Sequence, residues 1–187
     1  LSGKHAVVLV VAHRKESETV RSVIENAALD HIYLRPIGFD FLTAAALQAK
    51  RYMYKYGVTQ EQCAGVVVKN RGNAKNNPYA QEPLDLTIGD VLNSRMLAYP
   101  IRLLDSKPTS DGACALILAR EDKAKKITDK PIWIKGIGNC YDAHYLGDRD
   151  LADCDSLAIA AKRAYDMAGI TDPKNEIDVA EISEEYS

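Results

Sequence analysis

Signatures of several common protein classes are missing from this sequence. Only four cysteines occur among its 187 residues, and no two of them form a C-x-x-C pair, so a zinc ribbon within the chain is not expected. No apolar stretch approaches the roughly 18 to 20 residues that span a bilayer, so no membrane segment is expected. The sequence has neither a G-x-G-x-x-G fingerprint nor a Walker loop, which argues against those nucleotide sites.

The sequence also has no excess of charge of either sign. Lysine and arginine number 24, aspartate and glutamate 26, and the formal net charge is -2. Binding through a general phosphate field needs a basic excess, so no nucleic-acid partner is expected. No secretory signal pattern opens the sequence, and a 187-residue sequence without one fits reduced cysteine thiols, so we expect a cytoplasmic protein. The four histidines lack metal-ligand spacing, so no metal site is expected.

Hydrophobic patterning predicts both strands and helices. The runs at 6–11 and 113–119 are apolar on both faces, as in central buried strands. The remaining predicted strands are 131–137, paired with 113–119 as a hairpin, and 177–182. Together with the helices described next, these strands indicate an α/β layered architecture.

The predicted helices have apolar residues at spacings of three and four. They cover 20–28, 42–56, a short segment after a Thr87 and Asp90 capping pair, and 157–168 with Ser156 as cap. Residues 64–68 follow Thr59 and Gln62, and their pattern suits a helix or a strand equally.

Two polar regions are candidate sites. Residues 69–83 predict a turn-rich loop with the cations Lys69, Arg71 and Lys75. Cations beside asparagines and backbone amides suit phosphate groups, although exposed lysine and arginine are commonly just solvated. The second region consists of the turn at 110–112, before one predicted strand, and the carboxylates of 181–185, at the end of another. Ligands of open α/β sheets gather at the carboxyl ends of strands.

The chain from residue 45 onward resembles the thiolase superfamily, in the branch of sterol-carrier-protein-x thiolases and archaeal acetoacetyl-CoA thiolases. The matching segments include Arg51-Tyr52-Met53, Tyr56-Gly57-Val58-Thr59, Val68-Lys69-Asn70, Asn77-Pro78, Asp90-Val91-Leu92-Asn93-Ser94-Arg95, Arg102-Leu103-Leu104-Asp105 and Ser110-Asp111-Gly112-Ala113-Cys114-Ala115. The resemblance is dense from Tyr52 to Ala119 and looser to Ser187.

This resemblance implies a thiolase fold, a layered αβαβα arrangement of which only the central part is present. Residues 1–13 would end the N-terminal half-domain, 14–105 would form the loop domain, and 106–187 would begin the C-terminal half-domain. The family's nucleophilic cysteine would precede Leu1, and its histidine and second cysteine would follow Ser187. None of the four cysteines here would then be catalytic, and these residues alone would be inactive.

The resemblance also implies site residues. It aligns Ser183-Glu184-Glu185-Tyr186 with a family segment Asn-Glu-Ala-Phe or His-Asp-Cys-Phe. Ser183 and Glu184 are thereby implied to be catalytic, with a serine hydroxyl as oxyanion donor where the family has Asn or His, and Glu185 is an added charge. The residues implied to contact coenzyme A or its acyl arm are Phe39, Phe41, Leu42, Lys69, Arg71, Lys75 and Lys107.

The implied activity is that of an acyl-CoA C-acyltransferase of lipid metabolism. It would cleave or condense a β-ketoacyl-CoA reversibly through a cysteine thioester, with coenzyme A as substrate and no permanently bound cofactor. The alternative is a catalytically inactive thiolase-like structural or regulatory subunit; a ketosynthase-type enzyme is disfavoured because its histidine segments are absent. The resemblance further implies a homodimer or tetramer, with a small zinc-ribbon/OB-fold partner subunit in some members.

Overall fold

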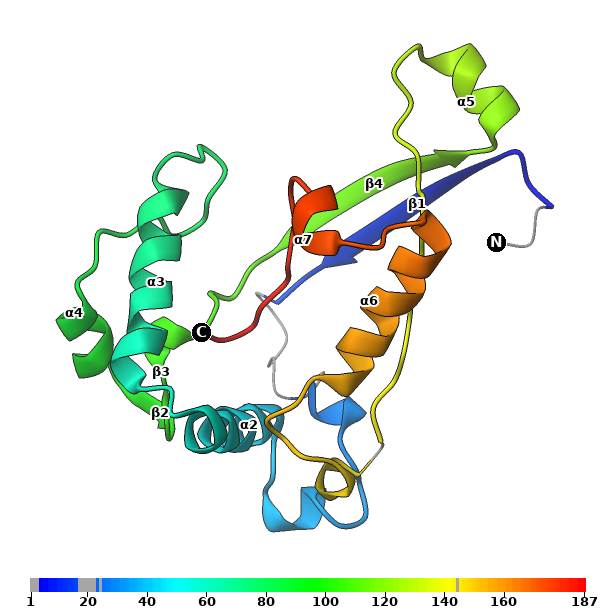
Figure 1. Ribbon diagram of the computed structural model, residues 1–187. Helices are drawn as coiled ribbons and strands as arrows, with labels where there is room; N and C mark the ends of the chain where they lie inside the picture. Colours follow the sequence, from blue (N-terminus) through cyan, green and yellow to red (C-terminus); the bar gives the residue numbers. More distant parts are fainter. Residues whose placement is uncertain (1–3, 17–22, 24, 144) are drawn as a thin grey trace.

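Two long strands form the main sheet of the molecule. The computed structural model describes residues 4–16, 23, 25–143 and 145–187. Strand β1 (Val7–Arg14) pairs antiparallel with β4 (Gly112–Ala119), so that Arg14 lies opposite Gly112. These strands are the long ribbon pair in Figure 1. The apolar runs that predicted two strands are therefore confirmed, and the strands are each other's partners.

The chain between these strands folds mainly as helices with a small hairpin. The elements are α2 (Phe41–Tyr56), α3 (Gln60–Ala74), α4 (Ile88–Asn93), β2 (Met96–Ala98) and β3 (Ile101–Arg102), with 3-10 turns at Asn26–Ala28, Arg35–Ile37 and Leu103–Asp105. They gather beyond the end of the long sheet where β1 ends and β4 begins, and the C-terminal end of the chain lies beside α3 (Figure 1).

A small apolar core holds this helical part together. Ala64 and Val67 of α3 and Val91 of α4 are buried against one another. The partly buried side chains around them are Val68, Leu86, Leu92 and Leu104. Leu104 follows β3, so this core also fixes the segment that leads to β4.

Local capping explains where these helices begin and end. The Asp40 side chain accepts a hydrogen bond from the Thr43 amide at the start of α2, and Gly57 ends that helix with a φ of 67°. Such a left-handed residue favours glycine. Thr59 and Gln62 form a reciprocal capping box at the start of α3. That box decides the ambiguous segment 64–68 in favour of a helix.

The chain after β4 is helical and irregular. It forms α5 (Glu121–Ile127), a 3-10 turn at Leu146–Asp148, α6 (Asp155–Ala168) and α7 (Pro173–Glu176). The stretch from 131 to 143 runs alongside α6 (Figure 1). Gly136 and Gly138 face the backbone of Ala164 and Ala160 there, with no room for a Cβ atom.

Several expected elements are wrong. Segment 131–137 forms no strand, because β4 pairs with β1 and the residues after β4 form α5 instead of a tight hairpin turn. Segment 177–182 also forms no strand, and Ile182 is exposed. The loop expected from residue 69 begins later, because α3 continues to Ala74 and carries Lys69 and Arg71.

Two further helix expectations have different outcomes. The last long helix is confirmed, but it begins at Asp155 after Cys154 and not at a Ser156 cap, and Gly169 ends it in a left-handed conformation. The capping box of Thr87 and Asp90 is confirmed at α4. Of the helix expected at 20–28, residues 20–22 and 24 lie outside the described part of the chain, and Asn26–Ala28 form a 3-10 turn.

Both faces of the long sheet are apolar and open. Leu9 is 63% exposed on one face, and Leu116, one position along from the Leu9 partner Ile117, is 58% exposed on the other. The chain exposes 13927 Å², against about 8,900 Å² for a compact protein of this mass. Strands that are apolar on both faces are normally covered by helices on both sides. The sheet therefore has the character of a central layer that the residues described by the structure leave uncovered.

Candidate functional site

A cavity of about 280 Å³ lies between α3 and two segments near the end of β3 and the C-terminus. Its lining residues are Val67, Asn70, Arg71, Leu104, Asp105, Ser106, Lys107, Pro108, Ile182, Glu184, Glu185, Tyr186 and Ser187. Three residues that the sequence singled out, Arg71, Lys107 and Glu184, thus meet in one place although they are far apart in the chain. This cavity is the candidate functional site.

Backbone pairing holds the C-terminal segment against the cavity. Ser106 and Tyr186 form an antiparallel bridge. The Lys107 amide donates to the Glu185 carbonyl over 3.1 Å, and the Ser187 amide donates to the Asp105 carbonyl over 3.1 Å. The position of Glu184 therefore depends on how firmly residues 105–107 are held.

The ammonium group of Lys107 lies between two carboxylates. Its Nζ is 3.0 Å from Oε2 of Glu185 and 3.9 Å from Oε1 of Glu16. Glu185 is also 3.9 Å from Nη1 of Arg14. Glu185 carries a negative charge where the corresponding segment of the thiolases has a small residue. Lys107 and Arg14 balance this charge.

Glu16 is a buried acid that the sequence reasoning missed. It is 7% exposed and accepts a hydrogen bond from the Ser110 amide over 2.8 Å. That hydrogen bond, helped by Arg14 and Lys107, holds the pKa of Glu16 below its ordinary value despite the opposing effect of burial. One available signal was its place soon after an apolar run that predicts a strand, where polar side chains of α/β sheets often gather.

The three expected basic residues have different surroundings. Arg71 is largely buried on α3, and its guanidinium donates to the Glu82 carboxylate over 3.0 Å and to the Ser106 carbonyl over 3.4 Å. Lys75 pairs with Asp85 over 3.1 Å and does not line the cavity. Lys69 is exposed on α3 and also lies outside the lining. The structure therefore brings only Arg71 of these three to the cavity.

Of the three expected apolar contact residues, Phe41 lies against a residue that lines the cavity. Phe41 lies against Tyr186, a lining residue, with ring centroids 6.4 Å apart and planes inclined by 33°. Phe39 and Leu42 are half-buried nearby in sequence but are not among the lining residues. Phe41 thus contacts a residue of the cavity wall without lining the cavity itself.

The two expected catalytic residues are exposed. Ser183 precedes the lining segment, whereas Glu184 belongs to it. Glu184 makes no hydrogen bond or ion pair with any residue that the structure describes. Its carboxylate is therefore available to accept a hydrogen bond or a proton from a ligand in the cavity.

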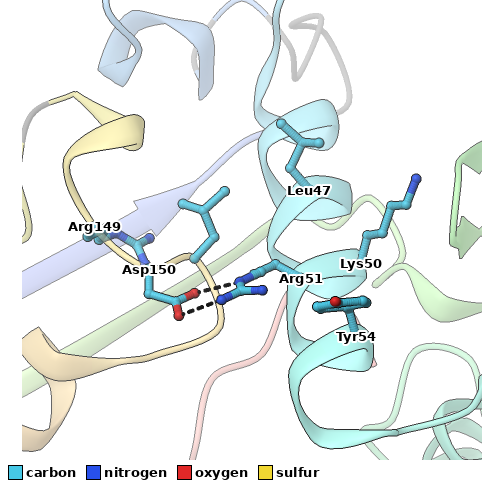
Figure 2. A pocket seen from close by; sticks show the side chains of 7 residues that line it. Leu47, Lys50, Arg51, Tyr54, Arg149 and Asp150 are labelled. Atoms are coloured by element: carbon cyan, nitrogen blue, oxygen red, sulfur yellow. Dashed lines mark hydrogen bonds and ion pairs between the residues drawn. The ribbon is translucent and has the colours of Figure 1, made fainter.

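A second, more open cavity of about 660 Å³ lies elsewhere, between α2 and residues 149–151. Figure 2 shows the guanidinium of Arg51 reaching Asp150, with its two hydrogen bonds of 2.9 and 3.0 Å. Lys50 and Tyr54 project from the same helix at its rim. None of the expected site residues lines this cavity, and its charged groups tie α2 to the chain before α6.

This ion pair predicts a pH dependence of stability. The pKa of Asp150 is held well below 3.8 by Arg51, then by the Ala152 amide and Lys55. Because the folded-state pKa is depressed, the stabilisation is complete above the unfolded value of about 3.9 and is lost as the pH falls through the folded pKa.

The free energy of unfolding of the full-length protein is therefore expected to fall on acidification, and to fall less steeply in Asp150→Asn. Chemical denaturation at intervals between about pH 6 and pH 2 measures both slopes. Other carboxylates contribute to the wild-type slope, so the difference between the two proteins isolates Asp150. Superimposable slopes would contradict a stabilising role for the pair.

Two further features are absent from residues 4–16, 23, 25–143 and 145–187. No group of three or more His, Cys, Asp or Glu side chains is arranged there to hold a metal ion. Among those same residues, no helix combines the length and apolar character needed to cross a membrane.

Comparison with known proteins identifies the family. The acetyl-CoA acetyltransferase of Methanothermobacter thermautotrophicus is 39% identical over 188 residues, which are 100% of this chain and 49% of that protein. Sterol carrier protein 2 of Gallus gallus is 31% identical over 144 residues, 74% of this chain and 26% of that protein. The chain belongs to the sterol carrier protein 2/thiolase-like branch. No protein-family model matches it.

A solved SCP2-thiolase-like protein of Mycobacterium smegmatis superposes with a TM-score of 0.67 and 18% identity, over 90% of this chain and 37% of that one, and shows the fold alone. The Ltp2-ChsH2(DUF35) aldolase superposes with a TM-score of 0.71 and 28% identity, over 88% of this chain and 44% of that one. The chain thus has an α/β fold that corresponds to part of a thiolase fold, as the sequence predicted. It spans about half the length of the acetyl-CoA acetyltransferases that it matches. The open faces of the β1–β4 sheet agree with this partial coverage.

Proposed function

We propose that the protein containing this chain is a thiolase-type acyl-CoA C-acyltransferase. The observation that carries the proposal is the cavity in which Arg71, Lys107 and Glu184 meet, in a chain 39% identical over its whole length to an acetyl-CoA acetyltransferase. The substrate would be a β-ketoacyl-CoA, with coenzyme A as second substrate and no permanently bound cofactor.

In this proposal a cysteine outside these 187 residues forms the acyl-enzyme. Its thiolate attacks the keto carbon, the Cα–Cβ bond breaks, and the enolate of the departing acyl-CoA takes a proton. The thiol of free coenzyme A then attacks the cysteine thioester and releases the second acyl-CoA, while the cysteine regains its proton through a histidine that is also outside the chain. Condensation is the reverse, and each half-reaction is easier than direct C–C cleavage.

The residues of this chain would bind and polarise the substrate. Ser183 would donate a hydrogen bond to the developing oxyanion, and the Glu184 carboxylate would accept a hydrogen bond or proton. Charged hydrogen bonds to coenzyme A would come from Arg71 and Lys107 in the cavity. The proposed outer contacts are the phosphate ligands Lys69 and Lys75 and the apolar residues Phe39, Phe41 and Leu42.

The proposal extends to domains, assembly and location. Residues 1–13 and 106–187 would belong to the two half-domains, with 14–105 as the loop domain between them. A homodimer or tetramer acting in cytoplasmic lipid metabolism is proposed. A partner subunit of zinc-ribbon/OB-fold type is proposed as well, and the solved Ltp2-ChsH2(DUF35) complex supports some kind of partner. A catalytically inactive subunit is the alternative, favoured by Ser183 in place of the family's Asn or His.

A second candidate function is aldol cleavage of a β-hydroxyacyl-CoA. The similarity to a solved aldolase, at a TM-score of 0.71 and 28% identity, favours it. Aldol cleavage would need a base near the β-hydroxyl group, and Glu184 could serve as one. It would not consume free coenzyme A or form a cysteine thioester.

Product analysis separates these functions. The full-length protein would be incubated with a series of β-ketoacyl-CoA esters with and without free coenzyme A, and separately with β-hydroxyacyl-CoA esters. A thiolase releases two acyl-CoA products only when free coenzyme A is present. Release of an aldehyde or ketone from the hydroxy esters alone would establish the aldolase, and inertness toward both series would favour the inactive subunit.

The cavity assignment predicts an effect on coenzyme A affinity. Lys107→Gln is expected to weaken binding to the full-length protein by about 1.5 to 3 kcal/mol, because a charged hydrogen bond is lost. Titration calorimetry measures this change. Lys162→Gln is the matched control, since Lys162 is exposed on α6 and pairs with Asp166 over 2.8 Å. Equal affinities of Lys107→Gln and wild type, with the fold intact, would remove Lys107 from the site.

A further inference from the structure

Glu16 has no role in the proposed reaction, yet it connects the end of β1 to the segment that leads into β4. Its side chain accepts from the Ser110 amide over 2.8 Å, while its own amide donates to Oδ1 of Asp111 over 2.7 Å. This reciprocal pair joins the end of β1 to the entry of β4. The sheet register puts Arg14 opposite Gly112, so continuing it by two residues brings Glu16 to Ser110.

A carboxylate in this position has a defined charge environment. Glu16 is 7% exposed, and a buried carboxylate is costly unless it is paired and hydrogen-bonded. Arg14 forms an ion pair with it, and the ammonium group of Lys107 lies 3.9 Å from the same carboxylate oxygen. Glu16 therefore attracts the Lys107 side chain toward the end of the sheet.

The next contacts lead from Lys107 to the candidate catalytic segment. Lys107 is bonded to Glu185 twice, through its ammonium group over 3.0 Å and through its amide over 3.1 Å. Glu185 directly follows Glu184, and the Ser187 amide completes the attachment by donating to Asp105. A continuous path of contacts thus runs from Ser110 through Glu16, Lys107 and Glu185 to Glu184.

We propose that Glu16 is a positioning residue that fixes Lys107, and through it the segment 184–187, at the cavity. The inference rests on the proposed function for its catalytic consequence, because Glu184 is taken to act on substrate. Its structural part, the attachment of 184–187 to 105–107, depends only on the contacts described above. Glu16 itself lies outside the lining and is not expected to touch the substrate.

The test compares Glu16→Ala and Glu16→Gln in the full-length protein. Amide hydrogen exchange of Lys107 and Ser187 reports the attachment directly, and kcat and KM report its consequence. Glu16→Ala is expected to speed exchange at both amides by about tenfold and to lower kcat by a similar factor, with KM within about threefold, as for loss of roughly one charged hydrogen bond.

The conservative variant and a control complete the experiment. Glu16→Gln keeps an acceptor for the Ser110 amide, so it is expected to restore part of the protection and part of kcat. Glu121→Gln, which removes an exposed carboxylate paired with Lys125 on α5, is expected to change neither.

The outcomes for Glu16 and for the proposed function are distinguishable. Faster exchange confined to the attachment amides supports the inference even if the wild-type protein proves to have no thiolase activity. Unchanged exchange at Lys107 and Ser187 in folded Glu16→Ala overturns it, whatever the activity. Faster exchange throughout the chain in Glu16→Ala, with no return of protection in Glu16→Gln, would also overturn the inference. Glu16 would then stabilise the fold as a whole and not the attachment of 184–187.

Discussion

Gly138→Ala is expected to lower the free energy of unfolding of the full-length protein by more than about 3 kcal/mol, because overpacking against rigid backbone exceeds the usual cost of an added methyl group. A Cβ at this position would lie 1.8 Å from the carbonyl oxygen and 2.8 Å from the carbonyl carbon of Ala160. Both are backbone atoms of α6, so no side chain can rotate to relieve the clash. Gly136 is in the same situation, 2.0 Å from the Ala164 carbonyl oxygen.

Gly65→Ala is the matched control for this prediction. Gly65 lies inside α3 with nothing within 4 Å of the added Cβ, so the same substitution is expected to stabilise the protein by about 0.5 to 1 kcal/mol through helix propensity. Chemical denaturation of the three proteins side by side gives both values. A Gly138→Ala protein within about 1 kcal/mol of wild type would mean that residues 131–143 do not pack on α6 as described.

The second large effect concerns catalysis. Glu184→Gln is expected to lower kcat on a β-ketoacyl-CoA by about 100-fold or more, the usual range for removing an acid–base group. The carboxamide has nearly the same shape, and Glu184 makes no hydrogen bond or ion pair with a described residue. Stability and KM are therefore expected to change little.

Steady-state kinetics of the full-length variant test this expectation. Glu181→Gln provides the control, because Glu181 is exposed three residues earlier and is not a lining residue of the cavity. It is expected to retain wild-type kcat. If Glu184→Gln also keeps kcat within about threefold of wild type, Glu184 has no acid–base role of ordinary size.

Local sequence signals predicted the elements that local interactions determine. The runs at β1 and β4 are apolar on both faces, and Gly57 and Gly169 end α2 and α6 in the left-handed conformation that glycine permits. The ambiguity at 64–68 came from three successive valines. The capping box of Thr59 and Gln62 resolves it, and that signal was already in the sequence.

Elements that depend on distant partners could not be predicted in this way. Segment 131–137 has a strand-like composition, but β4 pairs with β1, which lies near the start of the chain, and not with this segment. Gly136 and Gly138, in and just after that segment, approach α6 closely, and this role depends on alanines more than twenty residues away.

In the candidate site, too, some residues could be predicted from the sequence and others depend on contacts between distant segments. Arg71 came first from the basic residues of 69–83 and Lys107 from resemblance to the thiolases, as did the catalytic role of Glu184, and the fold brings all three to one cavity. Glu16 carried no comparable signal, because its importance comes from the antiparallel register of β1 and β4, which puts it beside Ser110. A single sequence does not contain that register in any local pattern.

The acyl-enzyme is the most direct test of the central claim that this chain is part of a cysteine-thioester thiolase. The full-length protein would be mixed with acetyl-CoA or a β-ketoacyl-CoA, quenched in acid, and analysed by peptide mass spectrometry. The account predicts one acyl group on a cysteine other than Cys63, Cys114, Cys140 and Cys154, removed on addition of free coenzyme A. Turnover of an acyl-CoA without any acylated cysteine, or acylation at one of those four, would contradict it.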